Sequence, residues 1–212
     1  MDPTIFGTLF ERGMDPAKRS QLGAHYTSRE DIETLVEPVV MQPLRREWGD
    51  VREVVDCLLT TGKTPGKGRA LTAESAQSAE NGQDPKPTGF ALSAFSANSA
   101  VNPLSPAIER KARREADAIL HGFLERLAGV TVLDPACGSG NFLYVTLQKL
   151  KGLEKEVVQY ALDRKFTAYL PQVGPWQLHG IEVNPYAFDL AQMTVWIGYL
   201  QWMREHGYLT TE

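Results

Sequence analysis

The chain has 212 residues, of which 42% are hydrophobic, so it can bury one hydrophobic core of ordinary size. Its formal net charge of −4 excludes the strongly basic composition that is typical of a protein holding duplex DNA by itself. Two cysteines, no signal peptide and no apolar run of about 18 residues argue against a disulfide framework and a membrane span, and favour a reducing cytoplasm.

Helical patterns dominate residues 1–59, which we predict to form an amino-terminal helical segment. A short amphipathic helix is expected over residues 4–12. A second helix is expected to begin after Ser28 and to run to about residue 44, because Ser28 can cap it and Asp31 follows three residues later. Apolar side chains share one face of this helix: Ile32, Leu35, Val36, Val39 and Val40.

Residues 60–105 differ sharply in composition. They are rich in Gly, Pro, Ala, Ser, Asn and Gln, and their large aliphatic residues show almost no periodicity. Such a segment cannot bury enough apolar surface to offset the entropy lost on ordering. We therefore expect a low-complexity linker or insertion here.

Residues 106–212 are predicted to alternate helices and strands. Pro106 should open a helix, because proline suits the first helical position. Basic side chains should face solvent on this helix: Arg110, Lys111, Arg113 and Arg114. The apolar side chains should face inward: Ile108, Ala112, Ala116, Ile119, Leu120 and Phe123.

Two strands are predicted further along, over residues 130–134 and 177–182, and each leads into a helix. The first helix should start near residue 141 and continue past residue 153, and the second should span about residues 185–204. Five side chains of the second helix are expected to be buried: Ala187, Leu190, Ala191, Val195 and Leu200.

The stretch VLDPACGSGNFL, from Val132 to Leu143, is the most informative part of the chain. An apolar strand leads through an acidic turn and a loop of small residues into a helix. Gly138 and Gly140 permit positive φ angles and let the backbone lie against a ligand. The helix that begins near Asn141 points its free N–H groups at the same place.

Spacing excludes two common interpretations of this loop. A dinucleotide fingerprint, G-x-G-x-x-G, would need a third glycine where the chain has Leu143. A phosphate-binding P-loop would need a lysine that the loop lacks, and Asp134 would repel a phosphate. An acid at the strand end instead suits a cationic or hydroxyl-bearing ligand, such as the amino-acid part of S-adenosylmethionine.

Three segments, in a consistent order, resemble the amino-group DNA methyltransferases and in particular their adenine-N6 branch. DPACGSGNF at residues 134–142 resembles motif I, LHGIEVNPYA at 178–187 resembles motif II, and LGAHYTS at 22–28 resembles the amino-terminal motif X. The helix at residues 190–202 is similar to that of the large restriction-modification and phage-defence methylases. The resemblance covers residues 15–56 and 106–205, and it departs at Ser28, where the family usually has proline.

The resemblance implies an α/β, Rossmann-like class I methyltransferase fold, incomplete because only the first two strands are present, with an amino-terminal helical extension. It also implies S-adenosylmethionine as the cofactor and DNA as the partner of the intact enzyme, and no metal. Glu182 would accept hydrogen bonds from the ribose hydroxyls. The residues implied to bind the cofactor are Tyr26, Thr27, Asp134, Ala136, Gly138, Gly140, Phe142, Glu182 and Val183.

The family's catalytic motif IV, [DNS]-P-P-[YFW], does not occur in these 212 residues. In the family it accepts hydrogen bonds from the target amine and stacks on the flipped base. Asn184-Pro185-Tyr186 has a single proline and follows Glu182 closely, so we expect it to open a helix instead. We therefore expect the cofactor-binding amino-terminal part of an enzyme, inactive alone and needing a missing carboxyl-terminal half.

Other interpretations stay open at this point. The chain could belong to a methylase of protein or RNA amines, or be a truncated, inactive remnant or cofactor-binding module. Asp134 could simply accept hydrogen bonds from backbone N–H groups, and Glu182 could be a surface acid. Phe142 could contact the cofactor or fill the core. Cys137 is expected only to pack, since methyl transfer to an amine needs no thiolate.

Overall fold

The computed structural model describes residue 13 and residues 27–64 and 104–208. The predicted helix over residues 4–12, the candidate Tyr26 and most of the predicted linker lie outside this range. The chain divides into two compact units, residues 1–51 with 117–212, and residues 52–116. The elements in chain order are α3 (Arg29–Val36), the π-helical turn η1 (Glu37–Met41), α4 (Gln42–Thr61), α5 (Pro106–Ala128), β1 (Val132–Asp134), α6 (Asn141–Asp163), the 3₁₀ turn η3 (Pro175–Gln177), β2 (Leu178–Gly180) and α7 (Pro185–Glu205).

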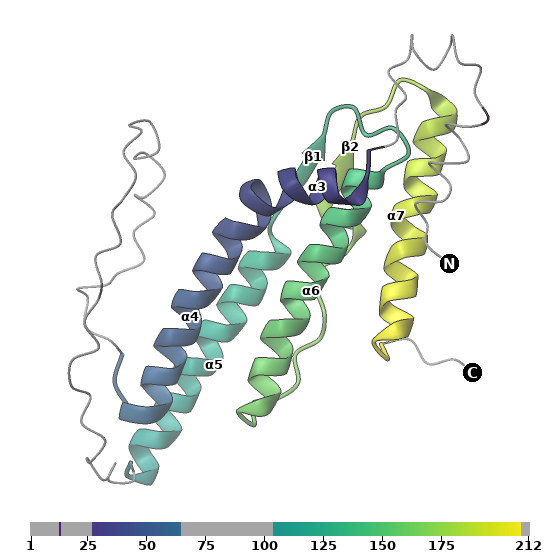
Figure 1. Ribbon diagram of the computed structural model, residues 1–212. Helices are drawn as coiled ribbons and strands as arrows, with labels where there is room; N and C mark the ends of the chain where they lie inside the picture. The colour runs from purple at the N-terminus through teal and green to yellow at the C-terminus, as the bar shows by residue number, and fades with distance from the viewer. Residues whose placement is uncertain (1–12, 14–26, 65–103, 209–212) are drawn as a thin grey trace, which may run out of the picture. The chain divides into compact units, whose positions relative to one another are not determined.

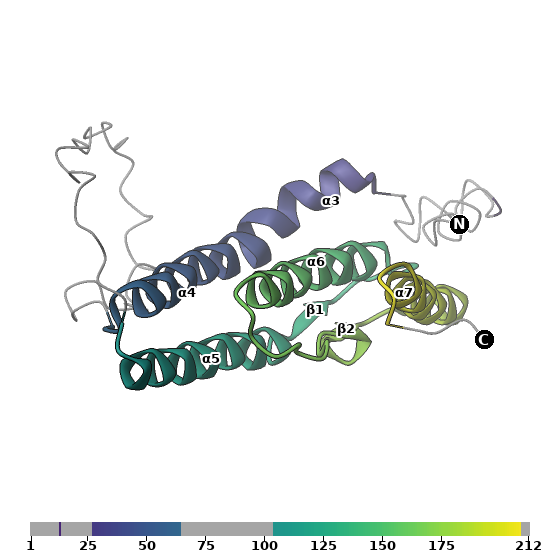
Figure 2. The same ribbon diagram turned by 90° about the horizontal axis from the view of Figure 1, so that it is seen from below.

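The described residues are mostly helical and contain one small parallel sheet. β1 pairs with β2, so that Val132 lies beside Leu178 and Asp134 beside Gly180. α6 links the two strands along the chain, contacts both of them and packs along α7 (Figure 1). The view from below also shows β1, β2 and α7 beside α6 (Figure 2). Fourteen of the 23 residues of α6 are buried, so the core of this unit lies around that helix.

Ser28 caps α3 as predicted, because its hydroxyl accepts a hydrogen bond from the N–H of Asp31 at 3.2 Å. The predicted apolar face of this helix is wrong in part, since Leu35 and Val39 are 57% and 73% exposed. Pro38 supplies no N–H, and the chain forms the π turn η1 at this point.

The π turn also explains which residues of this region are buried. The step from Val36 to the next buried residue is five positions instead of three or four. Helical spacing then resumes, and the helix continues to Thr61, well beyond the predicted end near residue 44. The buried apolar positions from α3 to the middle of α4 are Ile32, Val36, Met41, Leu44, Trp48 and Val51.

α5 begins at Pro106 as predicted. Its basic side chains are exposed, apart from the half-buried Arg113. Four of the predicted inward residues are buried, namely Ala112, Ala116, Leu120 and Phe123. Ile108, in the first turn of the helix, is 46% exposed instead, and the turn at Gly62 lies beside it.

Both strands are shorter than predicted. Val130 is not in β1, because its N–H donates to the carbonyl of Leu127 at the end of α5. Gln177 is not in β2, because it ends the 3₁₀ turn and its side chain donates to the carbonyls of Leu127 and Val130 at 2.9 and 2.8 Å. Val130 and Gln177 thus make hydrogen bonds to Leu127, at the end of α5, and to each other, outside the two short strands.

α7 spans almost the predicted residues, but one predicted buried residue, Leu200, is 49% exposed. The buried stripe of α7 includes Gly198, where an added Cβ would come 2.2 Å from the ring of Tyr144 on α6. Leu200 lies two residues beyond Gly198, or about 200° further round the helix, and so points away from α6. The close approach of the two helices decides the buried face.

A buried ion pair lies in α6. The ammonium of Lys151 is 2.6 Å from Oε2 of Glu154, and both side chains are inaccessible to solvent or nearly so. Oε1 of Glu154 accepts hydrogen bonds from the N–H groups of Gln172 and Val173, before β2, at 2.5 and 2.8 Å. The ammonium also lies 4.3 Å from the ring centre of Trp202 on α7. The pair therefore joins three parts of the unit.

Candidate functional site

The candidate site lies where the two parallel strands end. β1 ends at Asp134 and leads through a loop to α6, and β2 ends at Gly180 and leads through Glu182 to α7. Pairing extends slightly beyond the strands, since the N–H of Ile181 donates to the carbonyl of Asp134 at 2.9 Å. Asp134 and Glu182 therefore both lie at the edge formed by the carboxyl ends of the strands, which is where parallel sheets bind ligands.

Two glycines shape the loop that precedes α6. Gly138 and Gly140 have φ angles of 53° and 82°, a region that favours glycine. A Cβ at Gly140 would come 2.9 Å from Cα of Ala191, so α7 approaches the loop too closely for any side chain there. A Cβ at Gly138 would meet no atom of the described chain within 4 Å. Gly140 is therefore required for packing, whereas Gly138 lies beneath open space.

The amino terminus of α6 opens onto this loop. Gly140 is its N-cap and has no side chain to accept a hydrogen bond from the first turn. The N–H groups of that turn and the positive end of the helix dipole are thus available to acceptor groups of a ligand. The loop can serve a carboxylate as well as a neutral acceptor.

Glu182 connects the two loops of the site. Its Oε2 accepts a hydrogen bond from the N–H of Gly138 at 2.9 Å, and its Oε1 accepts one from the N–H of Asn184 at 2.8 Å. Glu182 is therefore not merely a surface acid, because it holds the glycine loop beside the turn into α7. Sequence reasoning did not foresee this contact.

Asp134 makes a local turn. Its Oδ1 accepts a hydrogen bond from the N–H of Ala136 at 3.1 Å, which is the backbone role considered as an alternative above. Asp134 and Glu182 are both half-buried. An ionised carboxylate has about four acceptor positions, so each retains capacity for hydroxyl or ammonium donors of a ligand.

Cys137 is buried between the loop and the sheet. A Cβ at Gly180 would come 2.6 Å from its Sγ, which shows how closely the thiol packs on β2. Burial raises the pKa of the Cys137 thiol, and the negative charges of Asp134 and Glu182 raise it further. A neutral packing role agrees with the expectation from the sequence.

The remaining candidates differ in their surroundings. The carbonyl of Thr27 accepts a hydrogen bond from Nδ2 of Asn141 at 2.9 Å, which brings the amino-terminal segment to the start of α6. Phe142 is half-buried, whereas Ala136 and Val183 are exposed at the strand ends. Asn141 was not among the residues predicted from the sequence to bind the cofactor. Its position in the first turn of a helix, directly after a glycine loop, could have indicated it.

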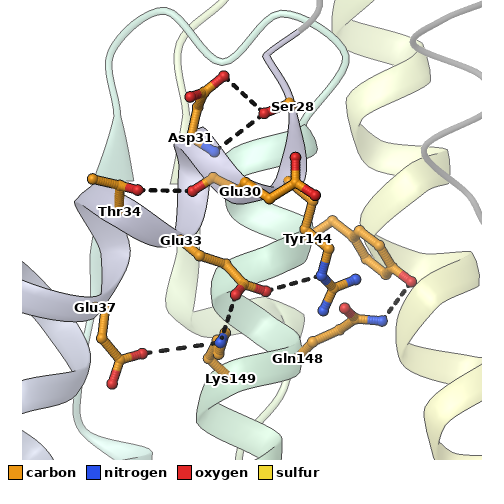
Figure 3. Close-up of polar contacts among 10 residues, drawn as sticks. Ser28, Glu30, Asp31, Glu33, Thr34, Glu37, Tyr144, Gln148 and Lys149 are labelled. Carbon is orange, nitrogen blue, oxygen red and sulfur yellow. Dashed lines mark hydrogen bonds and ion pairs between the residues drawn. The ribbon is translucent and has the colours of Figure 1, made fainter.

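Ion pairs hold α3 against α6 (Figure 3). Nζ of Lys149 lies 3.1 Å from Glu33 and 3.9 Å from Glu37, and Arg29 also pairs with Glu33, at 2.9 Å. Hydrogen bonds from Arg29 and then from Lys149 lower the pKa of Glu33. These contacts hold the second half of α3 and the start of η1 beside α6, about two turns beyond its first residue.

Residues 27–64 and 104–208 contain neither a cluster of metal-binding side chains nor a helix that could span a membrane. In these residues no three His, Cys, Asp or Glu side chains are grouped so that they could hold a metal ion. None of the helices described there has the length and apolar character needed to cross a membrane.

This geometry is that of a candidate ligand-binding site at the carboxyl ends of parallel strands, with a glycine loop, a helix amino terminus and two acids. Residues 108–209 match the family model described as the MmeI DNA-methyltransferase domain. The predicted resemblance to DNA methyltransferases is confirmed by this match.

Individual relatives agree with this assignment. The chain is 24% identical over 199 residues to DNA methyltransferase A of Bacillus subtilis (strain 168), covering 93% of this chain and 16% of that protein. It is 31% identical over 85 residues to a putative type II restriction enzyme and methyltransferase of Methanocaldococcus jannaschii, covering 39% of this chain and 7% of that protein.

A solved structure of the Type IIL restriction-modification enzyme MmeI in complex with DNA also matches, with a TM-score of 0.58 and 25% identity. The match covers 98% of this chain and 20% of the MmeI chain. This chain therefore spans between 7% and 20% of the length of these relatives.

Proposed function

We propose that the chain is the S-adenosylmethionine-binding part of a site-specific DNA adenine-N6 methyltransferase of the restriction-modification or phage-defence type, with a Rossmann-like class I fold in the intact protein. The observation that carries this proposal is the position of Asp134 and Glu182 at the ends of adjacent parallel strands, on either side of one glycine loop. The relatives described above support the assignment to DNA methylation, and we propose a cytoplasmic location.

The residues present fit this cofactor. Glu182 retains acceptor positions for the ribose hydroxyls, and the uncapped first turn of α6 suits the carboxylate of the methionine part. Asp134, at the end of β1, would interact with positive charge on the cofactor. The open space over Gly138 lets the ligand lie on the loop backbone. We propose that Tyr26, Thr27, Ala136, Gly140, Phe142 and Val183 complete the site.

Binding and orientation are the chemistry that these residues would provide. The sulfonium of S-adenosylmethionine is already a good methyl donor, so positioning accounts for most of the catalysis. The motif that holds the target adenine does not occur in these 212 residues. We propose that the intact protein supplies it elsewhere, together with most of the DNA contacts.

Replacing Asp134 by Asn tests the site with little structural disturbance. The Asn side chain keeps an oxygen that can accept the hydrogen bond from the N–H of Ala136, but it loses the negative charge. We expect affinity for S-adenosylmethionine, measured by isothermal titration, to fall roughly 10- to 100-fold, the effect of losing one charged hydrogen bond.

Asp189→Asn is the matched control, because Asp189 is an exposed acid on α7. This variant should bind like the unchanged chain. Equal affinity of the Asp134→Asn variant and the unchanged chain would contradict the proposed role of Asp134. An unchanged chain that binds neither S-adenosylmethionine nor S-adenosylhomocysteine would contradict the proposed function as a whole.

A further inference from the structure

Asn141 joins two segments that lie 114 residues apart in the chain. It is the first residue of α6, directly after the glycine loop, and is only 9% exposed. Its Nδ2 donates a hydrogen bond of 2.9 Å to the carbonyl of Thr27, which immediately precedes the N-cap Ser28 of α3. A carbonyl can only accept, so the amide group must present its nitrogen to Thr27 and its oxygen elsewhere.

The other half of this side chain is unsatisfied. Oδ1 of Asn141 is buried and has no hydrogen-bond partner among the residues that the structure describes. A buried acceptor without a partner is costly, and native proteins rarely retain one without a reason. A donor from a ligand on the adjoining glycine loop would satisfy it.

The hydrogen bond between Asn141 and Thr27 is one of several contacts that hold α3 on α6. About two turns further along α6, Lys149 pairs with Glu33 of α3 and Glu37 of η1 (Figure 3). These pairs are partly exposed and are therefore weak individually. The hydrogen bond from the buried Asn141 is the described contact that joins the residue before α3 directly to the start of α6.

We propose that Asn141 is the residue through which bound S-adenosylmethionine holds Thr27 and the start of α3 on α6. Its Oδ1 accepts a hydrogen bond from an ammonium or hydroxyl group of the cofactor, while its Nδ2 holds Thr27. Binding then fixes the amide orientation and tightens the start of α3 on α6. This inference rests on the proposed function, because it assigns a further residue to the same site.

The test combines titration with hydrogen exchange. In Asn141→Ala both hydrogen bonds are lost, and in Asn141→Asp the donor to Thr27 becomes an acceptor. We expect Asn141→Ala to bind S-adenosylhomocysteine roughly three- to tenfold more weakly, which is the effect of one hydrogen bond. Asn141→Asp keeps an oxygen that can accept a hydrogen bond from the ligand, and it should lose mainly the contact with Thr27. In the unchanged chain, the ligand should slow exchange of the N–H of Ile32, which donates to the carbonyl of Ser28 in the first turn of α3. The variants should lose this ligand-dependent protection.

Ser28→Ala is the matched control. It removes the side-chain cap of α3 and loosens its first turn, but it leaves Asn141 and the carbonyl of Thr27 in place. It should bind the ligand within about twofold of the unchanged chain and should still gain protection on binding. A purely structural role for Asn141 predicts instead that its variants and the control behave alike.

The outcomes separate this inference from the proposed function. If the unchanged chain binds and the Asn141 variants bind equally well with intact protection, the inference is wrong and the proposed function stands. If the unchanged chain does not bind, both are wrong. Titration with 5′-methylthioadenosine, which lacks the amino-acid part, identifies the donor: a loss of affinity confined to S-adenosylhomocysteine indicates the ammonium, and a loss with both ligands indicates a hydroxyl.

Discussion

At the scale of single residues, the two glycines of the loop have different tasks. Both require a positive φ, but only Gly140 lies against Ala191 of α7. Gly140→Ala should therefore lower the free energy of unfolding by roughly 2–5 kcal/mol, because a strained φ and an overpacked contact add together. Gly138→Ala should cost only about 1–2 kcal/mol.

Urea unfolding of the two variants measures this difference. Cofactor titration should give the opposite order, because a methyl group at residue 138 occupies the space proposed for the ligand. Equal stability of both variants would show that α7 does not hold the loop as described.

Glu33 is a residue whose charge should be visible in the pH dependence of stability. Its pKa in the folded chain is lower than the ordinary value of 4.5, through hydrogen bonds from Arg29 and then Lys149. Its contribution is therefore complete above about pH 4.5 and is lost as the pH falls through the folded-state pKa. Because about a third of the side chain is exposed, solvent and salt screening keep the effect small.

Chemical unfolding at pH 6 and at pH 3 gives the measurement for Glu33. Glu33→Gln should lose less stability between these two pH values than the unchanged chain, and added salt should reduce the difference. Glu30→Gln, at an exposed acid on the same helix, is the control. An identical pH profile for Glu33→Gln and the unchanged chain would show that the ion pairs of Glu33 do not stabilise the docking of α3.

At the scale of the elements, the buried pair of Lys151 and Glu154 determines how α6, the connection before β2 and α7 fit together. Lys151→Met should lower the free energy of unfolding by about 3–5 kcal/mol, because it leaves a buried carboxylate without its counter-ion. Adding Glu154→Gln should recover part of this loss, because the Gln oxygen can still accept the N–H groups of Gln172 and Val173.

A double-mutant cycle by denaturant unfolding measures the coupling between these two residues. The double variant should be more stable than Lys151→Met alone. If the double variant is less stable than Lys151→Met, the loss of the counter-ion does not explain the destabilisation. The aromatic contact with Trp202 is then the dominant interaction of Lys151.

At the scale of the whole molecule, cofactor binding and methyl transfer should separate. The 212-residue chain should not transfer labelled methyl groups from S-adenosylmethionine to DNA, because it has no [DNS]-P-P-[YFW] segment to hold a flipped adenine. Scintillation counting of DNA after incubation with the purified chain makes the measurement, and Asp134→Asn is the background control. Transfer above that background would reveal a catalytic loop within these residues.

Local sequence signals predicted the parts of the fold that depend on neighbouring residues. Ser28 and Pro106 begin helices where predicted, because capping and the first helical position involve only a few adjacent residues. The glycine loop between β1 and α6 was also placed correctly, whereas Glu182, predicted to end a strand, lies two residues beyond β2. The same short motifs identified the DNA methyltransferase family, which the comparisons confirm.

Only the tertiary structure decided which faces are buried and which distant residues meet. Leu35, Val39 and Leu200 fit a helical pattern but are exposed, because a π turn and the close approach of α7 to α6 set the buried faces. Glu182 reaches Gly138 across 44 residues, and Asn141 reaches Thr27 across 114. Periodicity and capping act over a few residues, whereas these contacts depend on how whole elements pack, and no local pattern in the sequence encodes that packing.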